Sequence, residues 1–244
     1  MNIVITGASR GIGYETAILF SKDKNNKIIC VSRKEFDGPN PYGNIFSIKF
    51  DLQNGDIGKT LLPEIKKHID SLDILINNAG TLINKPFVKL TDEDWQTIFE
   101  VNLFAPAKLI RLLLPLFTAL LSPSSPRAKS KGGEGPGVRS HILNISSIGG
   151  FQGSSKYPGL SAYSASKGAL AIFTECLAVE LAEKNIAVNC LCPGGVQTEM
   201  FESAFPGATA AMTAKQMAEK IYSFSLSAGK LMTGKIIPVS LSNP

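Results

Sequence analysis

Histidine and cysteine are scarce in this chain, whose 244 residues include 2 His and 4 Cys. Neither His68 nor His141 has a Cys or carboxylate partner at the spacing of metal ligands, and the cysteines are scattered along the chain. The sequence therefore predicts neither a metal site nor a disulfide framework. A chain of this length buries enough surface on folding to be stable without such crosslinks.

Long hydrophobic runs are also lacking. The most apolar stretch, Leu109 to Leu121, is interrupted by Arg111 and Pro115 and falls short of the roughly 20 apolar residues that a membrane span needs. The first residues carry no basic segment and too short an apolar run for a secretory signal. We therefore expect a cytoplasmic protein without membrane contact.

The overall composition is that of a soluble globular protein, with 44% hydrophobic and 18% charged residues. It excludes a disordered or fibrous chain and predicts one domain over residues 1–244, with two small domains as the alternative. The net charge of +5 is compatible with a nucleic-acid partner. Much of the excess lies in residues 122–140, which are rich in Ser, Pro, Gly and Lys. This segment predicts a mobile, solvated surface loop, or alternatively a recognition arm, and we expect no nucleic-acid binding.

Short runs rich in β-branched apolar residues alternate with longer amphipathic stretches along the chain. The runs have strand length and the stretches have helix length. The predicted strands are 2–5, 27–31, 44–50, 72–76, 141–145, 186–191 and 235–239. The predicted helices are 11–21, 55–68, 92–121, 161–184 and 213–224. We therefore expect an α/β fold, a doubly wound parallel sheet of about seven strands with helices on both faces.

The first predicted strand leads directly into a glycine-rich turn and then into an apolar-periodic helix. The turn reads Gly7-Ala8-Ser9-Arg10-Gly11-Ile12-Gly13. Glycines let a backbone turn sharply and approach a pyrophosphate at the positive end of a helix. The turn thus predicts a phosphate site, while a tight turn without a ligand stays open as the alternative.

Further motifs follow this turn in a fixed order: Asn77-Asn78-Ala79-Gly80, Asn102, Ser146-Ser147, Tyr163-x-x-x-Lys167 and Pro193-Gly194-x-x-x-Thr198. In order and spacing they resemble the short-chain dehydrogenase/reductase family over almost the whole chain. The likeness extends to its NADP-dependent carbonyl and β-ketoacyl reductases. The resemblance implies a Rossmann-type domain that binds a nicotinamide dinucleotide and reduces a carbonyl to an alcohol, or the reverse, by hydride transfer.

The residue types suit this chemistry. A hydride arriving at a carbonyl carbon creates an alkoxide, which needs a proton as it forms. Tyrosine, with an ordinary pKa of about 10, needs a neighbouring cation to act near neutrality. Lys167 lies on the same helix face as Tyr163. By resemblance, Lys167 also binds the nicotinamide ribose, Ser147 binds the substrate oxygen, and Asn102 helps to bind a water that links the lysine to solvent.

Cofactor choice depends on the end of the second strand, where Ser32-Arg33-Lys34 replaces the acidic residue typical of NAD sites. Arg33, together with Arg10 in the glycine turn, predicts binding of a 2′-phosphate and hence NADP(H) rather than NAD(H). The resemblance assigns Asp51 and Leu52 to the adenine. It assigns the remaining cofactor contacts to Asn78, Ala79, Gly80, Tyr163, Lys167, Pro193, Gly194, Val196 and Thr198.

Some features depart from the family pattern. Ser147 and Tyr163 are unusually far apart, with extra residues around 154–157 that include a second tyrosine, Tyr157. Phe201, Phe205 and Met212 follow Thr198 and predict either an apolar floor for the substrate or plain core packing.

The substrate, a small carbonyl compound or alcohol, is left open by the sequence. The apolar surface of residues 103–121 and 162–181 favours a homodimer or homotetramer. The alternative function is a non-catalytic NADP(H)-binding sensor or scaffold.

Overall fold

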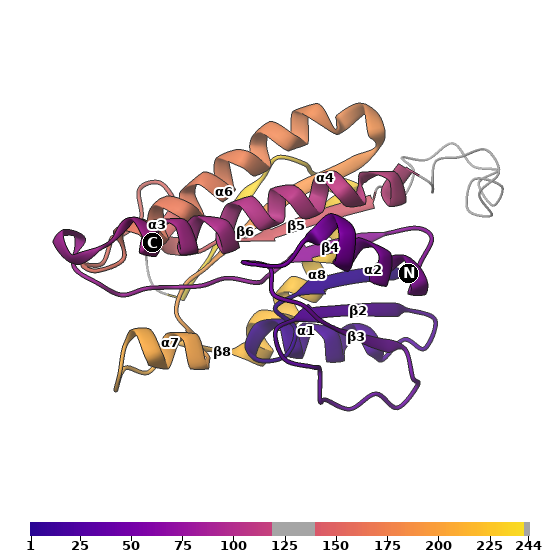
Figure 1. Ribbon diagram of the computed structural model, residues 1–244, viewed down its shortest axis with the longest axis horizontal. Coiled ribbons are helices and arrows are strands. Elements are labelled where there is room, and N and C mark those ends of the chain that lie inside the picture. Colours follow the sequence, from indigo (N-terminus) through magenta and orange to yellow (C-terminus); the bar gives the residue numbers. More distant parts are fainter. Residues whose placement is uncertain (119–139, 242–244) are drawn as a thin grey trace.

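The computed structural model describes residues 1–118 and 140–241 (Figure 1). The predicted loop 122–140 lies outside the described residues, apart from Ser140, which begins a strand. None of the helices within the described ranges has the length and apolar character needed to cross a membrane.

A parallel sheet forms the centre of the fold and confirms the predicted α/β class. Its order is β3-β2-β1-β4-β5-β6-β9, with 7 strands. The strands are β1 (Asn2–Thr6), β2 (Lys27–Ser32), β3 (Ile45–Lys49), β4 (Ile74–Asn77), β5 (Ser140–Ile145), β6 (Ile186–Pro193) and β9 (Ile236–Val239). A separate pair, β7 (Val196–Gln197) and β8 (Met212–Thr213), was not predicted, because strands of 2 residues leave no periodic pattern.

Side chains alternate between the two faces of the sheet, as expected for strands buried on both sides. On β1, Val4 packs into one apolar core, while Ile3 and Ile5 pack into the other. The first core is covered by α2 (Leu62–His68), α4 (Ala105–Thr118) and α6 (Ser161–Glu180). The second is covered by α1 (Gly11–Ser21) and α8 (Ala214–Leu231) (Figure 1).

The long helix predicted over 92–121 is instead broken into three parts within the described residues. They are α3 (Asp92–Phe99), a π-helical segment η3 (Glu100–Phe104) and α4. Thr91 caps α3 by accepting a hydrogen bond from the Asp94 backbone amide at 3.2 Å. A π-helical turn widens the helix by one residue, and such turns are frequent at functional sites. Here it carries the fully buried Asn102.

Other predicted helices differ mainly at their ends. The helix predicted over 55–68 consists of a π-helical segment η1 (Ile57–Leu61) followed by α2. A short 3₁₀ turn, η6 (Ala182–Lys184), follows α6, and α8 continues seven residues beyond the predicted end, from 224 to Leu231. Two further 3₁₀ turns are η2 (Phe87–Lys89) and η5 (Ile148–Gly150). The short α7 (Glu199–Ala204) lies beyond the carboxyl ends of the sheet strands (Figure 1).

The direction in which the chain adds strands reverses between β1 and β4. In an open α/β sheet the loops that leave the carboxyl ends at such a point separate and leave a crevice for a ligand. The glycine turn follows β1 and the Asn77–Gly80 segment follows β4, so the topology brings both predicted motifs to this crevice.

Candidate active site

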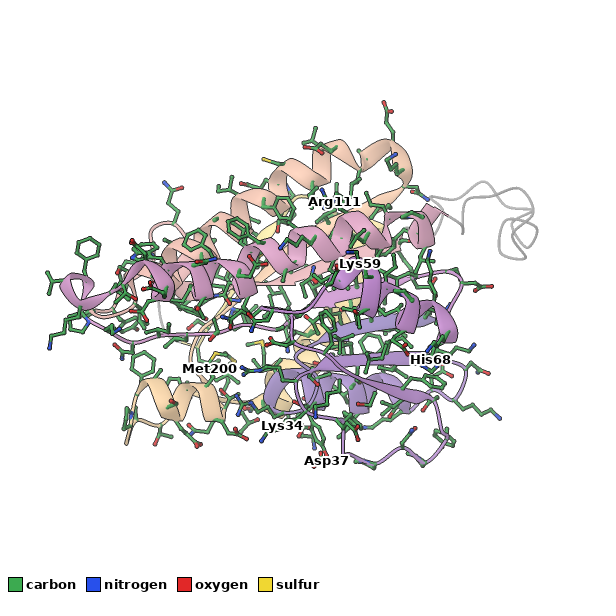
Figure 2. The ribbon with its side chains drawn as sticks, viewed as in Figure 1. Lys34, Asp37, Lys59, His68, Arg111 and Met200 are labelled. Atoms are coloured by element: carbon green, nitrogen blue, oxygen red, sulfur yellow. The ribbon has the colours of Figure 1, made fainter. Side chains whose placement is uncertain are left out.

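A cavity of about 670 Å³ opens at the carboxyl ends of the sheet strands. Figure 2 shows Met200, on α7, at this end of the molecule and His68 at the opposite end. Almost all predicted site residues line the cavity. They are Gly7, Ser9, Arg10, Gly11, Ile12, Ser32, Arg33, Asp51, Leu52, Asn78, Ala79, Gly80, Ser147, Tyr163, Lys167, Pro193, Gly194, Val196 and Thr198. Gly13 and Asn102 do not line it and act from behind the wall.

The glycine turn forms one wall and needs its glycines. Gly7 and Gly11 have φ angles of +67° and +57°, and a Cβ atom on Gly13 would lie 2.3 Å from the Gly7 carbonyl oxygen. The Asn78 side-chain amide donates hydrogen bonds of 3.1 Å to the Thr6 and Gly7 carbonyls. The side-chain N–H groups of Asn78 therefore hold the glycine turn against the segment that follows β4.

The first turn of α1 offers free donors beside this wall. Arg10 is the N-cap residue of α1, and its side chain makes no capping hydrogen bond. The first N–H groups of a helix lack partners within the helix and attract anions. Gly11 and Ile12 present this end of α1 to the cavity, which fits the pyrophosphate of a dinucleotide.

The ends of β2 and β3 form the next part of the wall. Ser32 donates a hydrogen bond of 2.8 Å to the Lys34 carbonyl, so its oxygen can still accept one. The Asp51 carboxylate accepts bonds of 3.0 Å from the Gln53 backbone and the Asn54 side chain, which holds it on the wall. Arg33 and Lys34 line the cavity beside Ser32.

Arg10 forms an ion pair that the sequence analysis missed. Its guanidinium contacts the carboxylate of Glu199, with side chains 50% and 64% exposed. Glu199 is the first residue of α7, which Thr198 caps by accepting a bond from the Phe201 amide at 3.3 Å. An acidic residue directly after an N-cap threonine is a helix-start signal, but nothing in the sequence indicates its partner.

Tyr163 and Lys167 project from α6 on the same side, as predicted. The Ser147 hydroxyl lies near the Tyr163 phenol and acts to lower its pKa. The Lys167 Nζ lies 5.9 Å from the centre of the Tyr163 ring and donates a bond of 2.9 Å to the Ile145 carbonyl. Ser147 follows β5, and its Oγ accepts a bond of 3.2 Å from the Gly149 amide. Two segments, α6 and the loop after β5, thus bring these three side chains together.

Burial controls the protonation of both groups. It raises the pKa of Tyr163 above its ordinary value, and the nearby Ser147 hydroxyl only partly offsets this effect. Burial lowers the pKa of Lys167 to about 8. The lysine was predicted to favour the phenolate, whereas burial has the larger effect and keeps Tyr163 protonated. A protonated phenol is the form that can donate a proton.

Ser146 and Asn102 support α6. Ser146 lines the cavity, but its Oγ donates a bond of 2.7 Å to the Lys167 carbonyl, which commits the hydroxyl proton to α6. Asn102 accepts a bond of 2.8 Å from the Thr81 amide and donates bonds of 2.9 and 3.0 Å to the Thr81 carbonyl and the Ser166 hydroxyl. Its side chain therefore joins the loop after β4 to α6.

The segments predicted to contact substrate separate into two groups. Phe201 and Phe205 line the cavity, together with Tyr157 from the extra residues before Tyr163. Met212 does not, because it packs into the core under α8. The sequence gives no role to Tyr157, and only the packing of separate segments places it on the wall.

Neither histidine contributes to a metal site. In the part of the chain that the structure describes, no group of three His, Cys, Asp or Glu side chains is placed to hold a metal ion. His141 is buried between the Ser225 carbonyl at 3.2 Å and the Asn189 amide at 3.1 Å. His68 stacks on Phe46.

Residues 1–209 match the family model described as short chain dehydrogenase. The chain belongs to the short-chain dehydrogenase/reductase family. It is accordingly an oxidoreductase that acts on a hydroxyl or carbonyl group with a nicotinamide cofactor. The recognised motifs, the sheet order and the cavity at the switch point agree with this membership.

The chain is similar to several named proteins and solved structures of the family. A 3β-hydroxysteroid dehydrogenase from Mediterraneibacter gnavus is 31% identical over 212 residues, which cover 82% of this chain and 67% of that enzyme. In other relatives the match covers a different share of their length, for example 53% of nodulation protein G from Rhizobium sp. and 84% of protein FixR from Bradyrhizobium diazoefficiens. A 3-ketoacyl-(acyl-carrier-protein) reductase from Brucella melitensis, complexed with NADH, has a TM-score of 0.79 at 25% identity, covering 98% of this chain and 96% of its own. A short-chain dehydrogenase from Escherichia coli, complexed with NADPH, also has a TM-score of 0.79 at 25% identity, covering 97% and 95%.

Proposed function

We propose that this protein is an NADPH-dependent carbonyl reductase, or the corresponding alcohol dehydrogenase, in which Tyr163 donates the proton. The observation that carries the proposal is that Tyr163, Ser147 and Lys167 lie together on the wall of one cavity, with the Lys167 Nζ 5.9 Å from the centre of the Tyr163 ring. Two hydroxyl groups that lie together on an open wall can both reach one substrate oxygen.

The cofactor fits the wall opposite these hydroxyls. The glycine turn and the start of α1 would hold its pyrophosphate, and Asp51 with Leu52 its adenine. The segments 78–80 and 193–198 would hold the nicotinamide half. When bound, the cofactor supplies or removes the hydride.

The chain's own residues would control the substrate and its proton. Ser147 orients the carbonyl oxygen by donating a hydrogen bond, and Tyr163 transfers its phenol proton to that oxygen as negative charge develops. Lys167, protonated below a pKa of about 8, stabilises the phenolate that is left. Asn102 holds the loop at Thr81 against α6 and so positions Lys167.

A preference for NADPH is supported by the cations at the end of β2. Arg33 and Lys34 line the cavity where an acidic side chain would bind a ribose hydroxyl, and Arg10 lies on the facing turn. A planar guanidinium suits a phosphate well. Relatives of known structure contain NADH or NADPH, so the preference rests on these side chains.

We also infer a self-association surface and a compartment. Apolar side chains on η3 and α6 are exposed, with Phe104 at 46%, Ile172 at 61% and Val179 at 79%. They support a homodimer or homotetramer. All 4 cysteines are free thiols, which suits the reducing cytoplasm.

The test is NADPH consumption, followed by absorbance, against acyl thioesters, aldehydes, diketones, quinones and sugars. NADH and the Tyr163→Phe variant are measured beside it. We expect turnover that requires NADPH and falls by about 10²-fold or more in Tyr163→Phe, with NADPH affinity retained. Preserved turnover in that variant would refute the proposed proton donor. Tight NADPH binding with no turnover by the wild type would favour the non-catalytic sensor or scaffold.

A further inference from the structure

The part of the cavity wall away from the glycine turn is built from three segments. The loop after β4 contributes Thr81 and Leu82. The segment before α6 contributes Ser155, Tyr157 and Leu160. The α7 region contributes Met200, Phe201, Phe205 and Ala208. None of these side chains carries a charge.

One charged side chain, Glu199, lies at the start of the α7 region, where it is paired with Arg10 of the glycine turn. The other charged side chains on the wall lie outside the three segments. They are Arg10, Arg33, Lys34, Asp51 and Lys167. Arg10 pairs with Glu199, and Lys167 is directed to the Ile145 carbonyl. A substrate group with a charge would lose hydration against the three segments without gaining an opposite charge, which is strongly unfavourable.

Aromatic rings dominate this part of the wall. The rings of Phe201 and Phe205 lie 5.2 Å apart, and those of Tyr157 and Phe205 lie 6.2 Å apart in an edge-to-face arrangement. Tyr157 is 53% exposed, so a bound ligand can bury part of its side chain. Rings in this geometry gain from packing against another apolar group.

Hydrogen bonds to backbone carbonyls hold the three segments in place. The Asn84 side-chain amide donates a bond of 2.8 Å to the Ala204 carbonyl at the end of α7. The Lys85 amide donates one of 3.0 Å to the Gly159 carbonyl. Gly159 has a φ of +85°, and a Cβ atom there would lie 2.0 Å from the Asn84 Oδ1. The aromatic wall is therefore preformed rather than loosely attached.

We infer that the substrate is an uncharged ketone, or the matching secondary alcohol, whose bulky apolar group packs against Tyr157, Phe201 and Phe205. Tyr157 is then a specificity-determining residue supplied by the extra residues before Tyr163. This inference names the substrate class of the proposed reductase and rests on that function.

The test uses three matched compounds: diacetyl, its phenyl analogue, and the phenyl analogue with a carboxylate on the ring. Binding is measured by calorimetry with and without NADP⁺, which cannot reduce the ketones, and kcat/KM by NADPH absorbance. We expect the phenyl compound to exceed diacetyl by about tenfold or more in both affinity and kcat/KM, and the carboxylate to lose about tenfold or more. Equal values for diacetyl and the phenyl compound, or a preference for the carboxylate, would overturn the inference.

Variants assign the effect to Tyr157. Tyr157→Ala should remove most of the phenyl preference, so that the ratio of kcat/KM for the phenyl compound to kcat/KM for diacetyl falls by about tenfold, whereas Tyr157→Phe should keep the preference. Tyr42→Ala is the matched control, because Tyr42 is 57% exposed and does not line the cavity. A phenyl preference that survives in Tyr157→Ala would refute the role of this residue.

The binding measurement separates this inference from the proposed function. Turnover that does not need Tyr163 refutes the proposed reductase mechanism and leaves the binding preference as an independent result. Turnover that needs Tyr163 but shows no phenyl preference refutes only the substrate class.

Discussion

The Arg10 guanidinium and the Glu199 carboxylate form an ion pair that joins the glycine turn to the start of α7, across 189 residues of sequence. Both side chains line the cavity and both are at least half exposed. Arg10 is one of the cations to which the NADPH preference is assigned. In the proposed NADPH site, Glu199 would therefore compete with the 2′-phosphate for the same guanidinium.

Removing this competitor should favour NADPH. An exposed ion pair is worth at most about 1 kcal/mol, so Glu199→Gln should tighten NADPH binding by about twofold to fivefold and leave NADH affinity unchanged. Titration of both cofactors by fluorescence or calorimetry measures this ratio. Arg10→Gln should change the ratio in the opposite direction. Equal changes for the two cofactors in Glu199→Gln would show that Arg10 does not contact the 2′-phosphate.

The pH dependence of reduction should follow Lys167. Burial lowers the pKa of Lys167 from 10.5 to about 8, so the ammonium is present below that pH and is lost above it. Because the cation stabilises the developing phenolate, kcat/KM should be level below about pH 8 and then fall by about tenfold per pH unit. In Lys167→Arg, whatever its absolute activity, the decline should move to higher pH, since arginine keeps its charge. A decline at the same pH in that variant would assign it to another group.

Gly13 should not tolerate a side chain. An alanine Cβ would lie 2.3 Å from the Gly7 carbonyl oxygen, and backbone atoms cannot move aside cheaply. Gly13→Ala should lower the free energy of unfolding by about 1–3 kcal/mol and weaken NADPH binding by about tenfold or more. Urea denaturation and cofactor titration measure the two effects. Gly58→Ala in η1 is the control, because its Cβ would have ordinary contacts of 3.5 Å or more and both quantities should stay near wild type.

His141 should make the fold sensitive to acid. Burial lowers its pKa from 6.5 to about 4, so between these values the unfolded chain binds the proton and the folded chain does not. The free energy of unfolding should therefore fall as the pH drops from about 6.5 to about 4, by about 3 kcal/mol in total from this group.

Nuclear magnetic resonance can follow His141 directly, because His68→Gln leaves it as the single histidine of the chain. Its ring signals should stay those of the neutral form until the pH approaches 4. Titration near pH 6.5 in the folded protein would contradict the buried, neutral state, and urea denaturation across the same range should then show no matching loss of stability.

Local patterns were sufficient for much of the fold. Short apolar runs rich in β-branched residues predicted the seven sheet strands, and the spacing of Tyr163 and Lys167 predicted their shared helix face. The break in the helix near Asn102 was not predicted, because one extra residue in a helical turn hardly disturbs an amphipathic pattern. The hydrogen bonds of the Asn102 side chain with Thr81 and Ser166 were not predicted either, because these residues are distant from Asn102 in sequence.

Local sequence was enough to predict the seven sheet strands, most of the helices, the glycine turn and most of the residues that meet at the cavity, because these depend on short-range periodicity and on motifs with a set order. How deeply Tyr163 and Lys167 are buried, which sets the direction of their pKa shifts, follows only from tertiary packing. It also decided that Arg10 meets Glu199 and that Tyr157 meets Phe205. Burial and pairing of this kind depend on how separate segments pack together, and local sequence does not encode that packing.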